Sequence, residues 1–133
     1  LVRKKIQERY VKELQQASPA DIPPQDEFTH QLKQMIQENL ADASFGIPEL
    51  ALALLMSQSQ VFRKTKAMLG MTPLLLIRSI RLAKAQELLK NKALNIAEVA
   101  AQTGFANPNY FSRAFQKEFG TTPSKYRKPF ITK

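Results

Sequence analysis

The sequence predicts an all-α fold in which two helix-turn-helix units flank one long helix. A pattern of helix starts and stops recurs at a spacing of about fifty residues, ending at Gly70-Met71-Thr72-Pro73 and again at Gly120-Thr121-Thr122-Pro123. Each copy reads as a short helix, a tight turn and a longer helix that ends at glycine. Apolar residues recur at helical spacing along most of the chain, and no alternating strand pattern is present. We therefore expect about seven helices after an N-terminal helical tether.

Residues 1–24 are predicted to form this tether and a linker. Ile6, Tyr10 and Leu14 recur at helical spacing among charged residues, and three prolines interrupt the segment that follows. A helix is then expected from about Asp26 to Leu40, because its apolar residues form one stripe. The members of that stripe are Phe28, Leu32, Met35, Ile36 and Leu40.

The first lobe of a domain spanning 25–133 is placed at about residues 25–72. Its first helix-turn-helix begins at Pro48, which suits the first turn of a helix. Ser57 and Gln60 have the spacing of a capping box, so they mark the start of the second helix. That helix is expected to end near the first glycine of the repeat.

A long helix is expected over about residues 73–90, where it joins the two lobes. Thr72 followed by proline is a start signal for it. Leu76 and Ile80 lie on one side, and a broader apolar face lies on the other. The members of that face are Ile77, Leu82, Ala85, Leu88 and Leu89. A helix that is apolar on two sides is expected to be buried on two sides.

The second lobe is placed at about residues 91–128. Asn95 and Glu98 have the spacing of a capping box, which marks the start of its first helix. Asn107 followed by proline marks the start of the second helix. A last short helix is expected from Thr122-Pro123, with Tyr126 as its anchor. The inward-facing residues of the second helix are predicted to be Phe111, Ala114, Phe115 and Phe119.

The composition excludes several classes of function. The chain has 133 residues, no cysteine and one histidine, His30, so disulfides, thiolate metal sites and multi-histidine metal sites are excluded. No paired carboxylates, phosphate-binding glycine loop or histidine–nucleophile set is present, so an enzyme is the least expected class. We expect no cofactor, catalytic residue, metal or small-molecule ligand. No apolar run approaches the roughly 18 residues that span a membrane, and a cytoplasmic domain is expected.

The net charge of +9 is unevenly distributed. Residues 1–45 hold six Lys/Arg and seven Asp/Glu, whereas residues 46–133 hold fourteen Lys/Arg and four Asp/Glu. The repeat region therefore carries a net charge of +10, which favours a polyanionic partner. A merely solvated basic surface is the alternative.

The second helix of a helix-turn-helix lies in the major groove, with its N-terminal residues at the base edges. Arginine can pair with guanine, asparagine or glutamine with adenine, and an aromatic edge can meet a thymine methyl group. The outward positions near these ends are Gln58, Ser59, Phe62, Arg63 and Lys66, and then Asn109, Tyr110, Arg113, Gln116 and Lys117. The candidate phosphate contacts are Ser57, Gln58, Lys64, Lys66, Ser112, Gln116 and Lys117.

Each of these residues also has a structural interpretation. Arg63 and Arg113 are ordinary surface arginines in the alternative view, but their equivalent placement in both copies favours DNA contact. Phe62 and Tyr110 are core residues in the alternative view, but Val61 is assigned to the core, which favours exposure of Phe62. At the level of function, a basic module for protein or anionic lipid and a nonspecific architectural DNA binder stand as alternatives to sequence-specific binding. Ser57 is interpreted as a cap rather than a nucleophile.

Residues 96–127, IAEVAAQTGFANPNYFSRAFQKEFGTTPSKYR, resemble the signature of the AraC/XylS family. Residues 77–85, IRSIRLAKA, are similar to that family's linker helix. The resemblance covers about residues 26–128 and implies a bacterial transcription regulator domain with seven helices and two helix-turn-helix lobes. The recognition helices would enter major-groove segments about 34 Å apart.

The resemblance implies a set of DNA base contacts, position by position. They are Ser59, Phe62 and Arg63 in the first lobe and Asn109, Tyr110 and Arg113 in the second. Two positions depart from the family pattern. Leu55 stands where glycine is usual in the first turn, and Thr65 stands where an apolar residue is common. Because leucine resists a positive φ, the first lobe is expected to be more loosely built or differently angled.

A narrower resemblance links residues 57–64, SQSQVFRK, with residues 70–73 and the tether to output domains of hybrid two-component sensors. It implies upstream receiver or sensor modules in the same polypeptide, with a histidine kinase among them. The start at Leu1 suggests a fragment cut from a longer protein, and a membrane anchor elsewhere in that parent is an open alternative. RNA polymerase and a second copy of the chain, paired through the tether, are further candidate partners.

Overall fold

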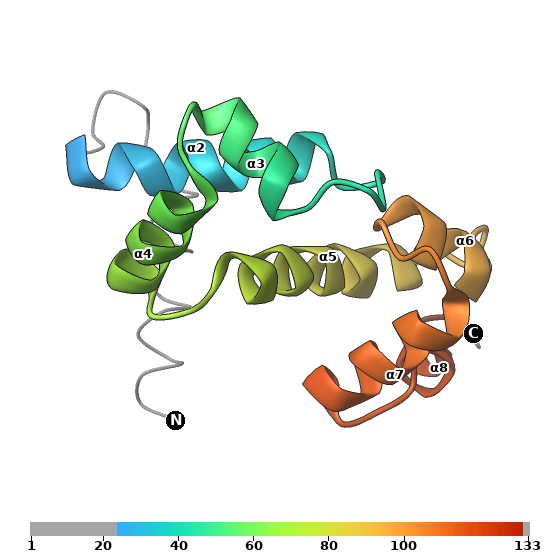
Figure 1. The fold of residues 1–133 in the computed structure, drawn as a ribbon. Coiled ribbons are helices and arrows are strands. Elements are labelled where there is room, and N and C mark those ends of the chain that lie inside the picture. The colour runs from blue at the N-terminus through green and yellow to red at the C-terminus, as the bar shows by residue number, and fades with distance from the viewer. Residues whose placement is uncertain (1–23, 132–133) are drawn as a thin grey trace. The chain divides into compact units, whose positions relative to one another are not determined.

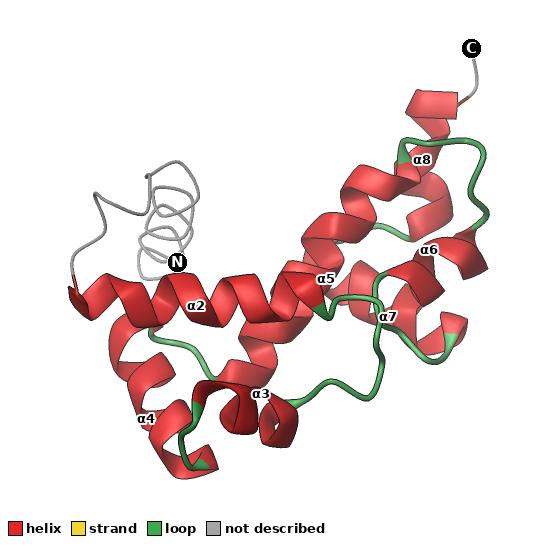
Figure 2. Cartoon of the chain, turned by 90° about the horizontal axis from the view of Figure 1, so that it is seen from above, coloured by secondary structure: helices red, strands yellow, loops and turns green. Residues whose placement is uncertain are grey.

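The structure is a computed structural model in which residues 24–131 are described. In this range the chain forms seven helices and no strand, so the all-α prediction is confirmed (Figures 1 and 2). The helices are α2 Pro24–Glu38, α3 Ile47–Leu54, α4 Gln58–Leu69, α5 Pro73–Leu89, α6 Ile96–Gln102, α7 Pro108–Phe119 and α8 Pro123–Ile131. The predicted tether stripe, Ile6, Tyr10 and Leu14, lies outside the described residues.

The described chain divides into two compact units. The first contains α2, α3, α4 and the start of α5 as far as Leu76. The second contains α5 from Ile77 onwards, together with α6, α7 and α8. It also contains residues 39–45, the loop between α2 and α3. Each unit therefore holds one helix-turn-helix. The loop of residues 39–45 belongs to the second unit, although it lies between two helices of the first.

The first unit is held by the apolar stripes of three helices. In α2, Phe28, Leu32 and Ile36 are buried at helical spacing, as predicted. Leu50 and Ala51 of α3 and Val61 and Leu69 of α4 are buried in the same unit. The α2–α3 and α3–α4 pairs are in direct contact, and the Thr29 hydroxyl of α2 lies 3.9 Å from the Met68 sulfur of α4. Burial of these stripes supplies the main stabilisation of the unit.

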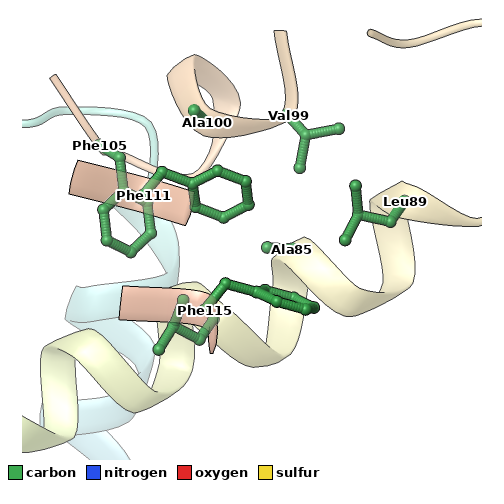
Figure 3. Close-up of a cluster of buried hydrophobic side chains, with 8 residues drawn as sticks. Ala85, Leu89, Val99, Ala100, Phe105, Phe111 and Phe115 are labelled. Atoms are coloured by element: carbon green, nitrogen blue, oxygen red, sulfur yellow. The ribbon is translucent and has the colours of Figure 1, made fainter. Parts of the chain in front are cut away.

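The second unit is built around an aromatic core (Figure 3). Phe111 and Phe115 of α7 are fully buried, and their ring centroids lie 5.8 Å apart. Phe115 also meets Phe119 at 4.6 Å and Tyr126 of α8 at 5.5 Å. Edge and tilted arrangements of this kind stabilise a core beyond the area they bury. The other buried members of the cluster are Leu82, Ala85, Leu89, Val99, Ala100 and Phe105.

Two arginines of the second unit bind backbone carbonyl groups. The Arg127 side chain of α8 donates through Nε to the carbonyl oxygen of Leu89 at 3.0 Å and through Nη2 to that of Asn91 at 2.9 Å. Because the last carbonyls of a helix have no partner within it, Arg127 satisfies the end of α5. Arg81 binds the loop that follows α2 in the same manner. No sequence pattern predicted a role for either arginine.

The predicted helix signals are confirmed in most places. Gly70 and Gly120 end α4 and α7 in the left-handed conformation, with φ of 70° and 76°. Thr72 accepts a hydrogen bond from the backbone nitrogen of Leu75 at the start of α5. Thr122 does the same for Lys125 at the start of α8. These signals are local, so the chain needs no distant contact to use them.

Several boundaries and burial assignments differ from the prediction. α2 begins and ends two residues earlier than expected, because Pro24 is tolerated in the first turn of a helix. Leu40 therefore lies beyond the helix and is only half-buried. On α5 the second predicted apolar side is partly wrong, since Leu76 is buried but Ile80 is half-buried. Ala114 and Phe119 of α7 are half-buried, and both pack against the core on the predicted inward side.

Two buried polar groups in the first unit have no hydrogen-bond partner. They are the Nζ of Lys33 on α2 and the Oγ1 of Thr65 on α4. Lys33 is only 5% exposed, and burial lowers the pKa of its ammonium from 10.5 to about 8. Thr65 stands at one of the two positions that depart from the family pattern, and its hydroxyl is left unsatisfied there. Unpaired buried polar groups destabilise the folded state.

We expect Lys33→Met to stabilise the protein, and the gain to shrink as the pH rises from 8 to 10.5. Below pH 8 the amine is charged in both states, so the folded state bears the full cost of burial. Between pH 8 and pH 10.5 the amine loses its proton in the folded state but keeps it in the unfolded state. The free-energy cost of burying Lys33 therefore declines by up to about 3 kcal/mol over this range. Urea unfolding at about pH 7, 9 and 10.5 measures this trend. The exposed Lys92→Met is the control, and an equal gain at every pH would contradict the assignment.

Candidate nucleic-acid interface

The turn of the first helix-turn-helix depends on one strained residue and one cap. Leu55 ends α3 in the left-handed conformation, with φ of 57° and ψ of 42°. It is the only residue other than glycine with positive φ among those the structure describes. Ser57 then caps α4, since its Oγ accepts from the nitrogen of Gln60 at 3.1 Å while the Gln60 side chain accepts from the nitrogen of Ser57 at 2.9 Å. The predicted capping box is confirmed.

The second helix-turn-helix has a glycine at the corresponding reversal. Gly104 has a φ of 81° and follows α6, whose start is held by the predicted Asn95–Glu98 capping box. Asn107 caps α7, and its Oδ1 accepts from the nitrogens of Asn109 at 2.7 Å and Tyr110 at 3.3 Å. The two helices thus begin with different cap residues. In both, the side-chain oxygen of the cap accepts a hydrogen bond from a backbone nitrogen of the first turn.

On α4 the buried and exposed residues separate as the sequence predicted. Val61 and Leu69 face the core, and Phe62 is 45% exposed rather than buried. Arg63 is exposed as well. Lys64, a candidate phosphate contact, places its Nζ 4.8 Å from the ring centroid of Phe28 on α2. The remaining candidates on and before this helix are exposed: Ser57, Gln58, Ser59 and Lys66.

On α7 the predicted core and the predicted outward face are also separate. Phe111 and Phe115 are buried, whereas Tyr110 is 44% exposed although its ring lies 5.9 Å from that of Phe105. Ser112 is half-buried, so it is the least accessible of the candidates. The other candidates on this helix are exposed: Asn109, Arg113, Gln116 and Lys117.

The side chains exposed on these two helices define the chemistry of the candidate interface. No group of three or more metal-ligating side chains occurs within residues 24–131. No helix in the same range is long and apolar enough to cross a membrane. What the geometry provides in each unit is a capped, exposed helix that carries arginine, amide, hydroxyl and aromatic groups. These groups match the donor and acceptor pattern of the major groove. The class defined by this arrangement is a DNA-binding domain with two helix-turn-helix motifs.

Comparisons with known proteins identify the family within that class. The family described as a helix-turn-helix domain matches residues 50–129. The Arabinose operon regulatory protein of Escherichia coli (strain K12) is 33% identical over 105 residues, which are 79% of this chain and 36% of that protein. The chain belongs to the AraC/XylS family of DNA-binding transcription regulators.

Relatives of two other kinds are similar to this chain. Histidine kinase P4 of Formosa agariphila is 38% identical over 93 residues, which cover 70% of this chain but 7% of the kinase. The C-terminal domain of AraT, a response regulator from Geobacillus stearothermophilus, matches with a TM-score of 0.73 and 31% identity, covering 82% of this chain and 88% of that domain. The chain therefore spans 7% and 36% of the lengths of these two curated relatives, and 88% of the C-terminal domain of AraT.

One matching structure contains DNA. It is the DNA-binding domain of AdpA, a global transcriptional factor, in complex with a target DNA. The match has a TM-score of 0.71 and 26% identity, and it covers 77% of this chain and 91% of that domain.

We expect Leu55→Gly to stabilise the protein by about 0.5–1 kcal/mol. Glycine removes about 1–2 kcal/mol of left-handed strain but adds less than about 1 kcal/mol of unfolded-state entropy. Because the Leu55 side chain is 92% exposed, little buried area is lost. Leu52→Gly is the matched control, since Leu52 is 77% exposed but lies inside α3, where glycine costs about 1 kcal/mol. Equal destabilisation of both variants in urea unfolding would contradict the strain argument.

Proposed function

We propose that α4 and α7 are the recognition helices of a sequence-specific double-stranded DNA-binding domain that regulates transcription. The observation that carries the proposal is the shared register of the two helices. Val61 and Phe111 lie four residues after their caps and are fully buried. Arg63 and Arg113 lie six residues after the same caps and are exposed. The buried residue fixes the rotation of each helix. One arginine therefore faces outward at the same distance from the cap in both helices.

The proposed base contacts are outward residues within the first two turns of each helix. The three on α4 are Ser59, Phe62 and Arg63, and the three on α7 are Asn109, Tyr110 and Arg113. The candidate phosphate contacts flank them, and the net charge of +10 over residues 46–133 favours binding to the backbone of DNA. The DNA-bound relative described above supports this assignment, because its DNA-binding domain matches this chain over both units.

We further propose that the domain is the output of a longer two-component protein. Support comes from the relatives, which include a histidine kinase and the C-terminal domain of a response regulator. A receiver or sensor module in the same polypeptide would then control DNA binding in the bacterial cytoplasm. RNA polymerase and a second copy of the chain, paired through the tether, stay predictions, and the chain itself carries no proposed enzymatic activity.

Selection from a random pool of double-stranded DNA at near-physiological salt tests the proposed function. We expect one enriched motif with two blocks separated by about one helical turn. Salt-sensitive complexes without an enriched motif would instead indicate a nonspecific architectural binder. Absence of DNA binding, with tight binding to anionic vesicles, would indicate a lipid-docking module.

Arg113→Ala should weaken binding to the selected motif by about 1–3 kcal/mol and relax the preference at one base pair. Arg63→Ala should do the same in the other block. Titrations against the motif and against every single-base variant measure both effects. Lys92→Ala, which removes an exposed charge outside the recognition helices, is the control and should leave the base preferences unchanged. Wild-type affinity and preference in Arg113→Ala would refute the role of Arg113.

A further inference from the structure

The loop of residues 39–45 has a shape that its own hydrogen bonds fix. The backbone nitrogen of Asp42 donates to the carbonyl oxygen of Asn39 at 3.1 Å, and that of Phe45 donates to the carbonyl oxygen of Asp42 at 3.1 Å. The Asp42 carboxylate accepts from the nitrogen of Ser44 at 2.9 Å and from its hydroxyl at 2.6 Å. The Phe45 side chain at the end of the loop is buried. Two consecutive turns and one buried ring therefore give the loop a defined shape.

Arg81 of α5 binds this loop within the second unit. Its Nη2 donates to the carbonyl oxygen of Asp42 at 2.9 Å and to that of Phe45 at 3.1 Å. The Nε of the same side chain is buried and has no hydrogen-bond partner. A buried donor without a partner destabilises the folded state, and the two bonds to the loop offset that cost. The position of the guanidinium therefore depends on the loop.

The reversal of the second helix-turn-helix packs against both Arg81 and the loop. Gly104 is buried, and a Cβ atom added to it would lie 2.7 Å from Nε and 2.9 Å from Cζ of Arg81. The same Cβ atom would collide with the carbonyl oxygen of Leu40, which belongs to the loop. The backbone of Gly104 therefore lies directly against the guanidinium and the loop. Glycine is needed here for this close approach as well as for its positive φ.

The two reversals of the domain differ in their surroundings. Leu55, at the reversal of the first helix-turn-helix, is 92% exposed. Gly104 is buried and has no side chain with which to anchor itself. The residue after it, Phe105, donates its backbone nitrogen to the carbonyl oxygen of Ala100 in α6 at 2.9 Å. The path of the chain into α7 therefore depends on α6 and on the contact with Arg81 and the loop, whereas the side chain at the first reversal is open to solvent.

We propose that the loop of residues 39–45, held by Arg81, is a positioning element for base readout by α7. The proposal rests on the proposed function, in which the outward residues of α7 touch base edges. The cap of α7, Asn107, lies three residues after Gly104, so a shift of the reversal moves the start of the helix. Side chains that recognise a ligand must be held to within about 0.5 Å of their working geometry. Loss of the contact between Arg81 and the loop would therefore disturb the base contacts of α7 and leave those of α4 in place.

The test compares the two blocks of the selected motif, with the binding of Arg81→Met measured against every single-base variant. Methionine keeps an unbranched apolar stem but cannot donate to the loop. We expect discrimination to fall by about tenfold in the block that Arg113→Ala relaxes, and to stay unchanged in the block read by α4. Arg81→Lys, whose ammonium group keeps three donors, should restore part of the lost discrimination.

Asp42→Ala weakens the loop and leaves Arg81 intact. Asp42 is exposed, and the change removes its side-chain bonds to Ser44 but keeps the carbonyl group that Arg81 binds. We expect a smaller loss of discrimination, roughly threefold, in the block read by α7 alone. This variant decides the question if Arg81→Met does not fold. Unchanged preferences in Asp42→Ala and in Arg81→Lys would then overturn the proposal.

Arg127→Met is the matched control for a purely structural effect. Arg127 is buried in the same unit and donates to two carbonyl groups, as Arg81 does, but its acceptors lie at and after the end of α5. Its loss should lower the free energy of unfolding but leave the base preferences of both blocks unchanged. If Arg81→Met behaves like Arg127→Met, or relaxes both blocks equally, the positioning role is wrong.

Two outcomes separate this proposal from the proposed function. If the wild-type protein shows no base preference at all, the proposed function fails. If the wild-type protein and Arg113→Ala behave as expected and Arg81→Met leaves the block read by α7 unchanged, only the positioning role fails. The backbone amide resonances of Gly104 and Phe105 in the free protein give a readout without DNA. They should shift in Arg81→Met and stay unchanged in Arg127→Met, and unshifted resonances in Arg81→Met would overturn the proposal.

Discussion

Each recognition helix is oriented by one backbone reversal, and the outward chemistry of the helix depends on it. The reversal uses a left-handed residue, Leu55 in the first unit and Gly104 in the second. A side-chain cap follows and fixes where the helix begins. A buried residue one turn later fixes its rotation about its own axis. The reversal, the cap and the buried residue together fix the start and the rotation of the helix. The sequence then decides which side chains face outward.

Local signals explain why much of this arrangement could be predicted from the sequence. Capping boxes, Thr-Pro starts and terminal glycines act within four residues, so they can be recognised without knowledge of the fold. The exposed state of Phe62 followed from the core position of its neighbour Val61, since adjacent residues on a helix point in different directions. The left-handed conformation at Leu55 agrees with the position at which the family usually has glycine.

Long-range contacts explain what could not be predicted. Arg81 meets carbonyls some forty residues earlier in the chain, and Arg127 meets the end of a helix nearly as far away. No periodicity distinguishes these arginines from the exposed arginines of α4 and α7. The burial of Lys33 could not be predicted from the sequence either, because a lysine beside an apolar stripe normally extends its charge into water. The strained leucine and two of the three unsatisfied buried polar side chains among the described residues lie in the first unit, and the third, Arg81, lies in the second. The buried Thr103 and Arg127 of the second unit are hydrogen-bonded.

The two units alternate along the chain, because the loop of residues 39–45 belongs to the second unit and lies between α2 and α3 of the first. A genetic crossover between relatives, placed anywhere after this loop and before α5, would transfer the loop of one parent into the second unit of another. Such a hybrid can still form the bonds of Arg81, because their acceptors are backbone carbonyls that every residue possesses. The length of this loop sets where the two carbonyl groups meet Arg81, so a hybrid keeps these bonds as long as the length of the loop is kept.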